Sequence, residues 1–263
     1  MKIEFSKYHG TGNDFIIIDD RNAGFPVSVD KISHLCHRRF GVGADGLILL
    51  QTHQEYDFRM RYFNADGNES TMCGNGGRCI TAFAHSLGIF DKDTVFQAVD
   101  GKHESMVKRV NDQDCWSIAL KMNDIHKIRL VENAFLIDSG SPHVVMFVED
   151  LKEMDVVGKG RSIRYSEEFA PDGTNVNFIE KWNGEYHIRT YERGVEDETL
   201  SCGTGTVASA VAVSIRHNLS GGIFEFIAPG GKLGVKFSKN RNVFEDVWLE
   251  GPAQRVFTGI IEL

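Results

Sequence analysis

The sequence is poor in several features that define common protein classes. Basic side chains are the minority, because 29 Lys and Arg stand against 37 Asp and Glu and the formal net charge is −8. Proteins that bind nucleic acids or anionic membrane surfaces usually carry a basic excess, so we expect no nucleic-acid and no membrane partner. The longest apolar run, residues 207–215, is far too short to cross a bilayer.

Cysteine is also scarce and irregularly placed. The five cysteines lie at positions 36, 73, 79, 115 and 202, and no two of them form a CxxC pair. This spacing indicates neither a disulfide framework nor a zinc site, so we expect no metal. The opening segment MKIEFSKYHG lacks the apolar core of a secretory signal. We therefore expect a cytoplasmic protein whose cysteines remain thiols.

The composition is otherwise that of a folded protein. Of the 263 residues, 41% are hydrophobic and 25% are charged, and this length suits one large domain or two of about 130 residues. Ser28 and the apolar residues after it predict a helix that runs through Arg39. Residues 88–130 carry no recognisable chemistry. Apolar or alternating runs predict strands at 3–7, 15–18, 47–51, 58–63, 135–137, 144–148, 176–180, 186–191, 223–227, 233–237, 243–250 and 256–263.

The two halves of the chain repeat one another. When Tyr62 is placed on Tyr191, a shift of 129 residues, Cys73 falls on Cys202 without a gap. The neighbouring matches are Glu69 with Glu198, Gly74 with Gly203 and Gly76 with Gly205. One period of about half the chain indicates two similar domains rather than a solenoid, which needs several short repeats.

Each copy of the repeat reads as a strand, a polar turn, Cys-Gly-x-Gly and a helix, expected over 79–86 and 207–217. A cysteine at a helix N-terminus lies beside backbone N–H groups and the positive end of the helix dipole, which lower the pKa of a thiol. The same N–H groups bind anions such as a carboxylate. A lone cysteine before glycines is more often a small buried residue, and Cys36, Cys79 and Cys115 fit that structural role. A phosphate-binding loop is the other alternative, but the GK[ST] ending is missing.

Two equivalent thiols suit the inversion of a stereocentre. Inversion needs a base on one face of the carbon and an acid on the other, and a thiolate and a thiol can exchange these roles. The α-hydrogen of an amino acid is very weakly acidic, so charge stabilisation by helix N-termini that hold the α-carboxylate would supply much of the rate.

Four motifs closely resemble the diaminopimelate epimerase family. They are Gly10-Thr-Gly-Asn-Asp-Phe15, Phe63-Asn-Ala-Asp-Gly67, Met72-Cys-Gly-Asn-Gly-Gly-Arg-Cys79, and Tyr191-Glu-Arg-Gly194 with Cys202-Gly-Thr-Gly205. The resemblance covers essentially the whole chain. It implies interconversion of LL- and meso-diaminopimelate in lysine and peptidoglycan precursor synthesis, without pyridoxal phosphate or metal.

The resemblance also implies an architecture. The expected fold is α/β, with two pseudo-symmetric domains, each a mostly antiparallel sheet wrapped round a central helix, and the active site in the cleft between them. We expect residues 1–122 with the returning strand 254–263 to form the domain of Cys73, and residues 123–253 to form the domain of Cys202. Homodimers are usual in this family.

The family's functional residues can be carried over position by position. Cys73 and Cys202 match the catalytic pair, with Cys73 as the conventional proton donor and Cys202 as the acceptor in the LL-to-meso direction. His143 and Glu192 match groups that tune the thiols. The matching substrate-binding positions are Asn13, Asn64, Gly74, Asn75, Asn177, Glu192, Arg193, Gly203 and Thr204.

Two departures from the family pattern concern the substrate geometry. Gly46 stands where the family often has Gln, and Ser141 stands where it often has Asn. Glycine has no side chain to bind substrate, so the contact at position 46 is lost or supplied otherwise.

Other functions remain open at this point. A two-cysteine racemase of proline or hydroxyproline would share the thiols. The polar side chains of Asn64, Asn177, Glu192 and Arg193 instead suggest a substrate with a distal amino-acid group. A non-catalytic clamp for a small molecule would keep the glycine loops without needing cysteine in both. A redox or metal protein has no CxxC motif to support it.

Overall fold

The computed structural model describes residues 1–112 and 114–262. Leu263, the last residue of the expected strand 254–263, lies outside the described residues, as does Gln113. The chain divides into a first unit, Met1–Leu120 with Gly251–Leu263, and a second unit, Lys121–Glu250. Among the described residues, we find no helix with the length and apolar character needed to span a membrane.

The first unit is a closed barrel around one helix, α2 (Gly74–Ser86). Neighbouring strands pair in the order β1, β2, β3, β4, β6, β7, β8 and β17, and β17 pairs with β1 to close the ring. The pairs β2–β3 and β4–β6 are parallel and the other pairs are antiparallel. The strands are β1 (Lys2–Gly10), β2 (Asn13–Asp19), β3 (Gly46–Gln51), β4 (Phe58–Asn64), β6 (Asp93–Ala98), β7 (Gly101–Asp112), β8 (Cys115–Lys121) and β17 (Val243–Glu262).

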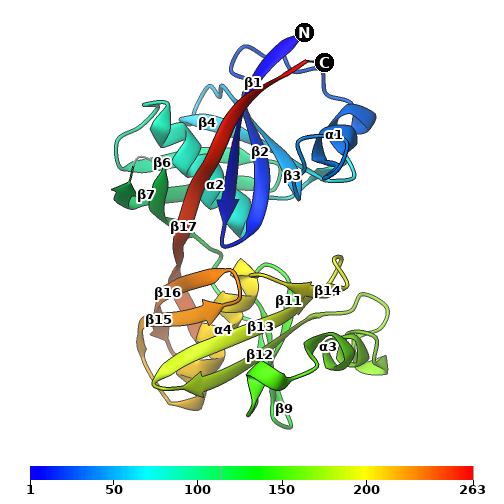
Figure 1. Ribbon diagram of the computed structural model, residues 1–263. Coiled ribbons are helices and arrows are strands. Elements are labelled where there is room, and N and C mark those ends of the chain that lie inside the picture. The colour runs from blue at the N-terminus through cyan, green and yellow to red at the C-terminus, as the bar shows by residue number, and fades with distance from the viewer. Residues whose placement is uncertain (113, 263) are drawn as a thin grey trace. The chain divides into compact units, whose positions relative to one another are not determined.

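Helix α2 is enclosed by this barrel, and Figure 1 shows it behind β1, β2 and β17. Every residue from Asn75 to Ala84 is buried. A helix buried on all sides cannot be amphipathic and must consist of small or apolar residues, with any polar group hydrogen-bonded. Thr81 follows this rule, because its hydroxyl bonds to the Gly77 carbonyl at 2.8 Å and lies 2.7 Å from Ser105 Oγ.

Helix α1 (Val29–Cys36) packs on the barrel's outer side through Ile32 and Leu35. The helix ends three residues before the expected end at Arg39. His37 is extended, with ψ 121°, and its Nδ1 accepts hydrogen bonds from the Arg39 and Phe40 N–H groups. This local bonding by a side chain competes with the next helical turn.

The second unit repeats the plan around α4 (Gly203–Arg216). Its strands pair in the order β9, β10, β11, β12, β13, β15, β16 and β17, with β11–β12 and β13–β15 parallel. Ile125, in the segment before β9, forms an isolated antiparallel β-bridge with Phe244 of β17. The strands are β9 (Ile128–Val131), β10 (Ala134–Asp138), β11 (Pro142–Phe147), β12 (Asn175–Trp182), β13 (Glu185–Glu192), β15 (Gly221–Ala228) and β16 (Gly231–Asn240).

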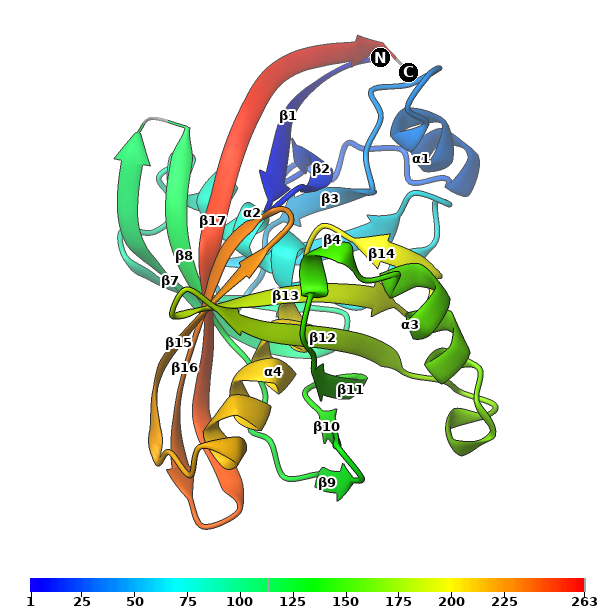
Figure 2. The same cartoon turned by 60° about the horizontal axis from the view of Figure 1, so that its bottom comes forward.

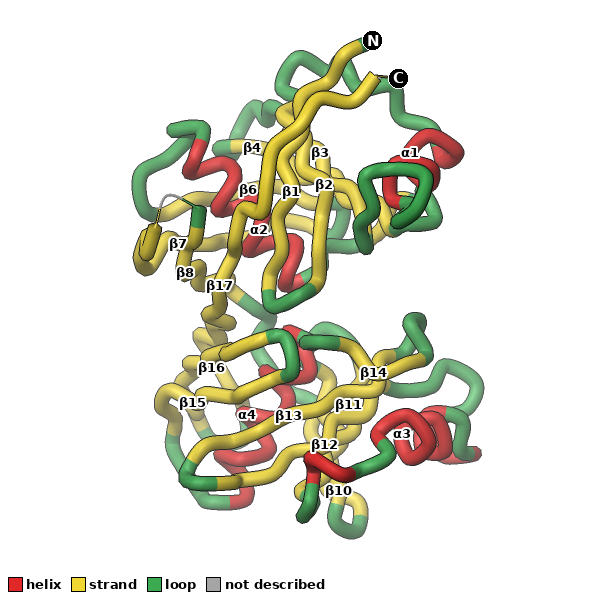
Figure 3. Tube along the Cα trace, viewed as in Figure 1, coloured by secondary structure: helices red, strands yellow, loops and turns green. Residues whose placement is uncertain are grey.

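Helix α4 packs against β10, β11, β12, β15 and β16, and Figure 2 shows it beside β15 and β16. Its residues from Gly205 to Ser214 are buried and all are Gly, Ala, Val, Ser or Thr, which lets the strands approach closely. Outside the sheet, α3 (Val156–Arg164) packs on β12 and β13, with the short helices η1 (Leu151–Glu153) and η2 (Glu167–Phe169) near it in sequence. Figure 3 shows strands around the central helix of each unit.

The expected fold class is confirmed: both units are α/β, and each is a mostly antiparallel sheet around a central helix. Three details differ from expectation. Helices α2 and α4 begin at Gly74 and Gly203, several residues earlier than expected. Strands β6, β7 and β8 fall in a stretch for which no strand was predicted. The two strands expected over 243–263 are a single strand, β17.

Candidate active site

Cys73 is the N-cap residue of α2. Its backbone is extended, with φ −95° and ψ 137°, and its carbonyl accepts the Gly77 N–H at 2.7 Å to close the first helical turn. The backbone N–H groups that begin the helix therefore lie beside the thiol, as the sequence predicted. The thiol is partly buried and donates to Asn13 Oδ1 at 3.6 Å.

Two other residues of the expected site meet Cys73 in the first unit. Asn75 Nδ2 donates to Asn13 Oδ1 at 3.3 Å, so the same oxygen accepts from both Asn75 and Cys73. Asn13 Nδ2 donates to Asp45 Oδ2 at 2.7 Å, which fixes the amide with its oxygen toward the thiol. The sequence analysis missed Asp45, although its position between two glycine-rich turns was a signal of a loop residue.

Asn13 lies beside a cluster of charged side chains, Lys7, Asp14, Arg38 and Asp45. Asp14 lies 2.7 Å from Lys7 Nζ and 2.7 Å from Arg38 Nη2, and Arg38 also reaches Asp45 at 2.7 Å. Burial by itself would raise the pKa of Asp14, but hydrogen bonds and charge from Arg38 and Lys7 outweigh it and lower the pKa to about 2. Asp14 is therefore a carboxylate at neutral pH.

Cys202 is the N-cap residue of α4, in the same backbone position as Cys73. Its φ is −122° and its ψ is 114°, and its carbonyl accepts the Thr206 N–H at 2.9 Å. The residue is 8% exposed, and its sulfur lies 3.5 Å from Thr204 Oγ1. The first hydroxyl of helix α4 thus contacts the thiol.

His143 connects to this hydroxyl as a neutral imidazole. Burial, and secondarily the positive charge of Arg193, lower the pKa of His143 to about 3. Asn177 Nδ2 lies 3.0 Å from Nδ1 and can only donate, so the imidazole proton resides on Nε2. Nε2 lies 2.9 Å from Thr204 Oγ1 and 3.0 Å from Ser141 Oγ. His143 therefore reaches Cys202 through Thr204.

Asn177 and Asn175 hold this arrangement together. Asn177 is fully buried, donates also to the Val144 carbonyl at 3.0 Å and accepts from Thr190 Oγ1 at 3.0 Å. Its contact with substrate stays a prediction. Asn175, which the sequence analysis missed, donates to Ser141 Oγ at 3.1 Å and accepts the Arg193 N–H at 2.9 Å. Its position two residues before Asn177 in one strand, on the same face, was the available signal.

The Glu192-Arg193 turn is held by a carboxylate that the sequence analysis also missed. Glu196 accepts the Gly194 N–H at 3.0 Å and the hydroxyls of Tyr165 and Tyr191 at 3.0 Å each. The Gly194 hydrogen bond is the main cause that lowers the pKa of Glu196 to about 2. Glu192 itself ends β13, opposite Asp197 of β14 (Asp197–Thr199).

The expected site residues therefore form one group in each unit. The first unit holds Asn13, Asn64, Cys73, Gly74 and Asn75, and the second holds His143, Asn177, Glu192, Arg193, Cys202, Gly203 and Thr204. Burial raises the pKa of Cys36 to about 12 and also raises that of Cys79, consistent with their expected structural roles. Within the described residues, no cluster of three or more His, Cys, Asp or Glu could hold a metal ion.

Comparison with known proteins agrees with these motifs. The family model described as diaminopimelate epimerase matches residues 5–127 and 135–256. The diaminopimelate epimerase of Flavobacterium psychrophilum is 46% identical over 253 residues, covering 95% of this chain and 97% of that protein. The one of Chlorobaculum tepidum is 42% identical over 263 residues, covering 97% and 99%. The chain belongs to the diaminopimelate epimerase family, a family of isomerases.

Solved structures of lower identity share the fold alone. A PhzF-family phenazine biosynthesis protein from Bacillus anthracis superposes with a TM-score of 0.79 at 13% identity, covering both chains completely. A hydroxyproline epimerase from Agrobacterium vitis gives a TM-score of 0.71 at 15% identity, covering 100% of this chain and 93% of that one.

The structure leaves little room for a side chain at Gly46, where we expected the Gln of the diaminopimelate epimerase pattern to be replaced. A Cβ at position 46 would lie 2.5 Å from the Tyr62 ring and 2.5 Å from the Phe63 carbonyl oxygen. Gly46 pairs with Asn64 across β3 and β4, and Tyr62 lies two residues before Asn64. The Tyr62 ring thus occupies the space that a side chain at 46 would enter.

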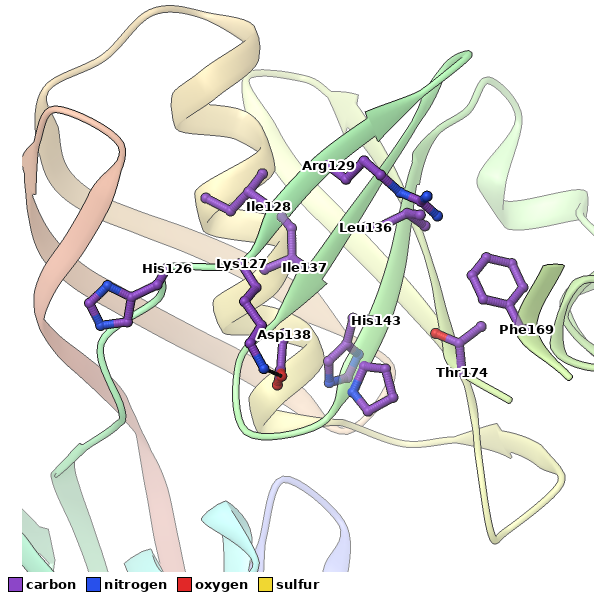
Figure 4. Close-up of a pocket in the computed structure, with 11 residues that line it drawn as sticks. His126, Lys127, Ile128, Arg129, Leu136, Ile137, Asp138, His143, Phe169 and Thr174 are labelled. Carbon is purple, nitrogen blue, oxygen red and sulfur yellow. Dashed lines mark ion pairs between the residues drawn. The ribbon is translucent and has the colours of Figure 1, made fainter. Parts of the chain in front are cut away.

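One pocket of about 400 Å³ adjoins the second group of site residues (Figure 4). It contains His143 on one wall and the Lys127–Asp138 pair, 3.8 Å apart, on another. Cys202 and Thr204 do not line it, so it shares only the imidazole with the site. The lining residues are His126, Lys127, Ile128, Arg129, Leu136, Ile137, Asp138, Pro142, His143, Phe169 and Thr174.

Proposed function

We propose that this chain interconverts LL- and meso-diaminopimelate through a thiolate and a thiol, without pyridoxal phosphate or metal. The observation that carries the proposal is the placement of Cys73 and Cys202, each at the N-cap of the buried central helix of its unit. Family membership supplies the substrate, and the two matching thiols supply the chemistry.

The proposed reaction transfers two protons. In the LL-to-meso direction, the Cys202 thiolate removes the α-proton and leaves the electron pair on the α-carbon as a carbanion. The Cys73 thiol then donates its proton to the opposite face, and Cys73 is left as the thiolate. The backbone N–H groups of Gly74-Asn75 and Gly203-Thr204 hold the α-carboxylate, where negative charge accumulates in the transition state.

Side chains around the two thiols orient the reacting groups and the substrate. Asn13 and Asn75 are already held together beside Cys73, and Thr204 and His143 beside Cys202. We assign Asn64, Asn177, Glu192 and Arg193 to the rest of the substrate. His143 and Glu192 are the groups assigned to tune the thiols, and His143 acts as a neutral hydrogen-bond donor, because burial lowers its pKa to about 3.

The same proposal includes the domain organisation, the oligomeric state and the cellular location of the protein. We infer two domains, 1–122 with 254–263 and 123–253. We infer a cytoplasmic homodimer, and the apolar side chains of Val256 and Ile260 on one face of β17, which are 53% and 65% exposed, offer a surface for a second copy. Sedimentation equilibrium of the purified protein measures its oligomeric state directly.

The test of the reaction is turnover in heavy water. Purified protein is given LL-diaminopimelate, and each stereoisomer is analysed by mass spectrometry at low conversion. We expect the meso product to carry deuterium at the inverted carbon while unreacted substrate stays unlabelled, because the incoming proton comes from a thiol that exchanges with solvent. Product that kept its original α-hydrogen would contradict the two-thiol mechanism.

Single-cysteine variants complete the test. Cys73→Ser and Cys202→Ser should each lose at least about a thousandfold in kcat/KM, because each thiol performs one of two obligatory proton transfers. Cys115→Ser is the matched control and should retain activity.

A racemase of proline or hydroxyproline is the alternative function. It is not favoured, since the likeness to a hydroxyproline epimerase at 15% identity concerns the fold. Faster inversion of hydroxyproline than of diaminopimelate would reverse this choice.

A further inference from the structure

Asp45 ends a chain of hydrogen bonds that runs through two site residues of the first unit. The Arg78 guanidinium donates to Asn75 Oδ1 at 2.7 Å. The Asn75 amide donates to Asn13 Oδ1 at 3.3 Å, and the Asn13 amide donates to Asp45 Oδ2 at 2.7 Å. Every link therefore runs in the same direction, from a cation of α2 to the carboxylate that precedes β3.

The two ends of this chain determine which way each amide group points. A guanidinium can only donate hydrogen bonds and an ionised carboxylate can only accept them, whereas an Asn amide can do both. Asn75 must therefore turn its oxygen toward Arg78. Asn13 must turn its NH2 group toward Asp45. The other polar atom of that amide, Asn13 Oδ1, then faces Cys73 and accepts its thiol at 3.6 Å.

Asp45 is itself held in place by further hydrogen bonds. Its Oδ1 accepts from Arg38 Nη2 at 2.7 Å, and its backbone N–H donates to the Asp14 carbonyl at 2.9 Å. Its Oδ2, the atom that binds Asn13, also accepts the Asp14 N–H at 3.2 Å. The carboxylate therefore has a fixed position, although its side chain is 42% exposed and its removal leaves no internal cavity.

The second unit uses the corresponding place in the fold in a similar way. At the repeat shift of 129 residues, Gly46, the neighbour of Asp45, corresponds to Asn175. Asn175 begins β12 and donates to Ser141 Oγ at 3.1 Å, and this oxygen lies 3.0 Å from His143 Nε2. In each unit, a polar side chain at the start of one strand holds a polar group at the start of the parallel strand beside it.

We propose that Asp45 is a positioning residue for the Cys73 thiol: as the last acceptor of this chain, it holds Asn13 so that Oδ1 faces the sulfur. Its effect depends on the acceptor atom rather than on the negative charge, because the charge is already paired with Arg38. This inference rests on the proposed function, in which the Cys73 thiol donates a proton to the α-carbon. A fixed acceptor restricts the orientation of the S–H group before that transfer.

The first test observes the thiol without any substrate. The S–H stretching band of Cys73 is measured by infrared spectroscopy at about pH 5, where an ordinary cysteine is protonated, as the difference between each protein and its Cys73→Ser variant. A thiol that donates a hydrogen bond absorbs at lower frequency than a free thiol. We expect Asp45→Ala to broaden the band or move it to higher frequency, because Asn13 loses one of its two amide contacts. An identical band in both proteins, or no Cys73 band in the native one, overturns the proposal whether or not diaminopimelate is the substrate.

The kinetics of three variants separate the acceptor from the charge. Asp45→Ala removes both and should lower kcat/KM for diaminopimelate about tenfold or more. Asp45→Asn should retain most of the activity and the native S–H band, because its amide oxygen can still accept from Asn13 while Arg38, whose side chain is 59% exposed, turns to water. Arg38→Ala is the matched control, since it removes the same ion pair and leaves the carboxylate. If either Asp45→Asn or Arg38→Ala is as impaired as Asp45→Ala, the proposed role of the acceptor is wrong.

Melting temperatures show whether these variants are folded. If Asp45→Ala does not fold, Asn13→Ala replaces it in the infrared measurement. The Cys73 band should then move to higher frequency, because the acceptor atom itself is gone. An unchanged band in that variant would equally overturn the proposal.

Discussion

Single residues decide how charge is distributed around the two thiols. His143 is the clearest case, because its sequence position beside Pro142 gives no indication of its protonation state. Burial in the second unit keeps the imidazole neutral, and Asn177 fixes its proton on Nε2. Asp14 shows the opposite outcome, since its two cationic partners keep it ionised although it is largely buried.

The Asp14 cluster predicts a pH-dependent contribution to stability. The pKa of Asp14 in the folded protein, about 2, is below its ordinary value of 3.8. Its stabilising contribution is therefore complete above about pH 4 and is lost as the pH falls toward 2, and the shift corresponds to about 2 kcal/mol. Asp14→Asn should lower the free energy of unfolding at pH 7 by that order and flatten its decline between pH 4 and 2.

Urea denaturation at several pH values measures this effect, with the exposed Glu55→Gln as the control. If the free energy of unfolding of Asp14→Asn fell between pH 4 and 2 as steeply as that of the native protein, the Lys7 and Arg38 contacts would not stabilise the fold.

At the scale of elements, much of the architecture could be predicted from the sequence, because the Cys-Gly-x-Gly repeat marks both central helices. Their first turns were missed because glycine has low helix propensity. The barrel overrides this preference, since only residues without bulk fit at positions such as Gly76 and Gly77, where an added Cβ would lie 3.3 Å from Ile48 and 2.9 Å from Met72. Strand β6 was missed although Thr94, Phe96 and Ala98 alternate with more exposed residues, which is a weak but detectable strand signal.

The partners of the site residues could not be predicted in the same way. Asp45, Asn175 and Thr204 reach their partners through strand register and side-chain rotamers, which depend on the folded barrel rather than on local sequence. The position of the Tyr62 ring next to Gly46 could not be predicted either, because it depends on the register in which β3 pairs with β4.

This close packing predicts that Gly46 tolerates no side chain. Gly46→Ala should lower the free energy of unfolding by about 1–3 kcal/mol, because the Phe63 carbonyl and the Tyr62 ring would both have to move. Gly24→Ala is the matched control, since a Cβ there meets nothing within 4 Å. Thermal unfolding of both variants makes the comparison. Equal melting temperatures for the two would mean that β3 and β4 adjust without strain.

At the scale of the whole molecule, the first barrel is discontinuous in sequence. Residues 251–262 of β17 lie between β1 and β8 and pair with both. Without them, both neighbouring strands would present open edges, which are prone to aggregation. A protein truncated after Glu250 should therefore be insoluble or oligomeric.

Circular permutation provides the control for truncation. Lys2 pairs with Glu262 in antiparallel register, so the segment 251–263 can be moved in front of Met1 through a short turn. The permuted protein should be soluble, with the native circular dichroism spectrum. A truncated protein that remained soluble and native-like would show that closure of the barrel is dispensable.

The discontinuity also sets the order of events during synthesis. The strands that form the second unit lie in one continuous stretch of chain, 121–250, so the whole second unit is made before residues 251–262. Most of the first unit is translated earlier, yet its closing strand is translated after the whole second unit. The barrel that is begun first is therefore finished second, and Cys73 lies at the end of an enclosed helix only after the second unit has been made.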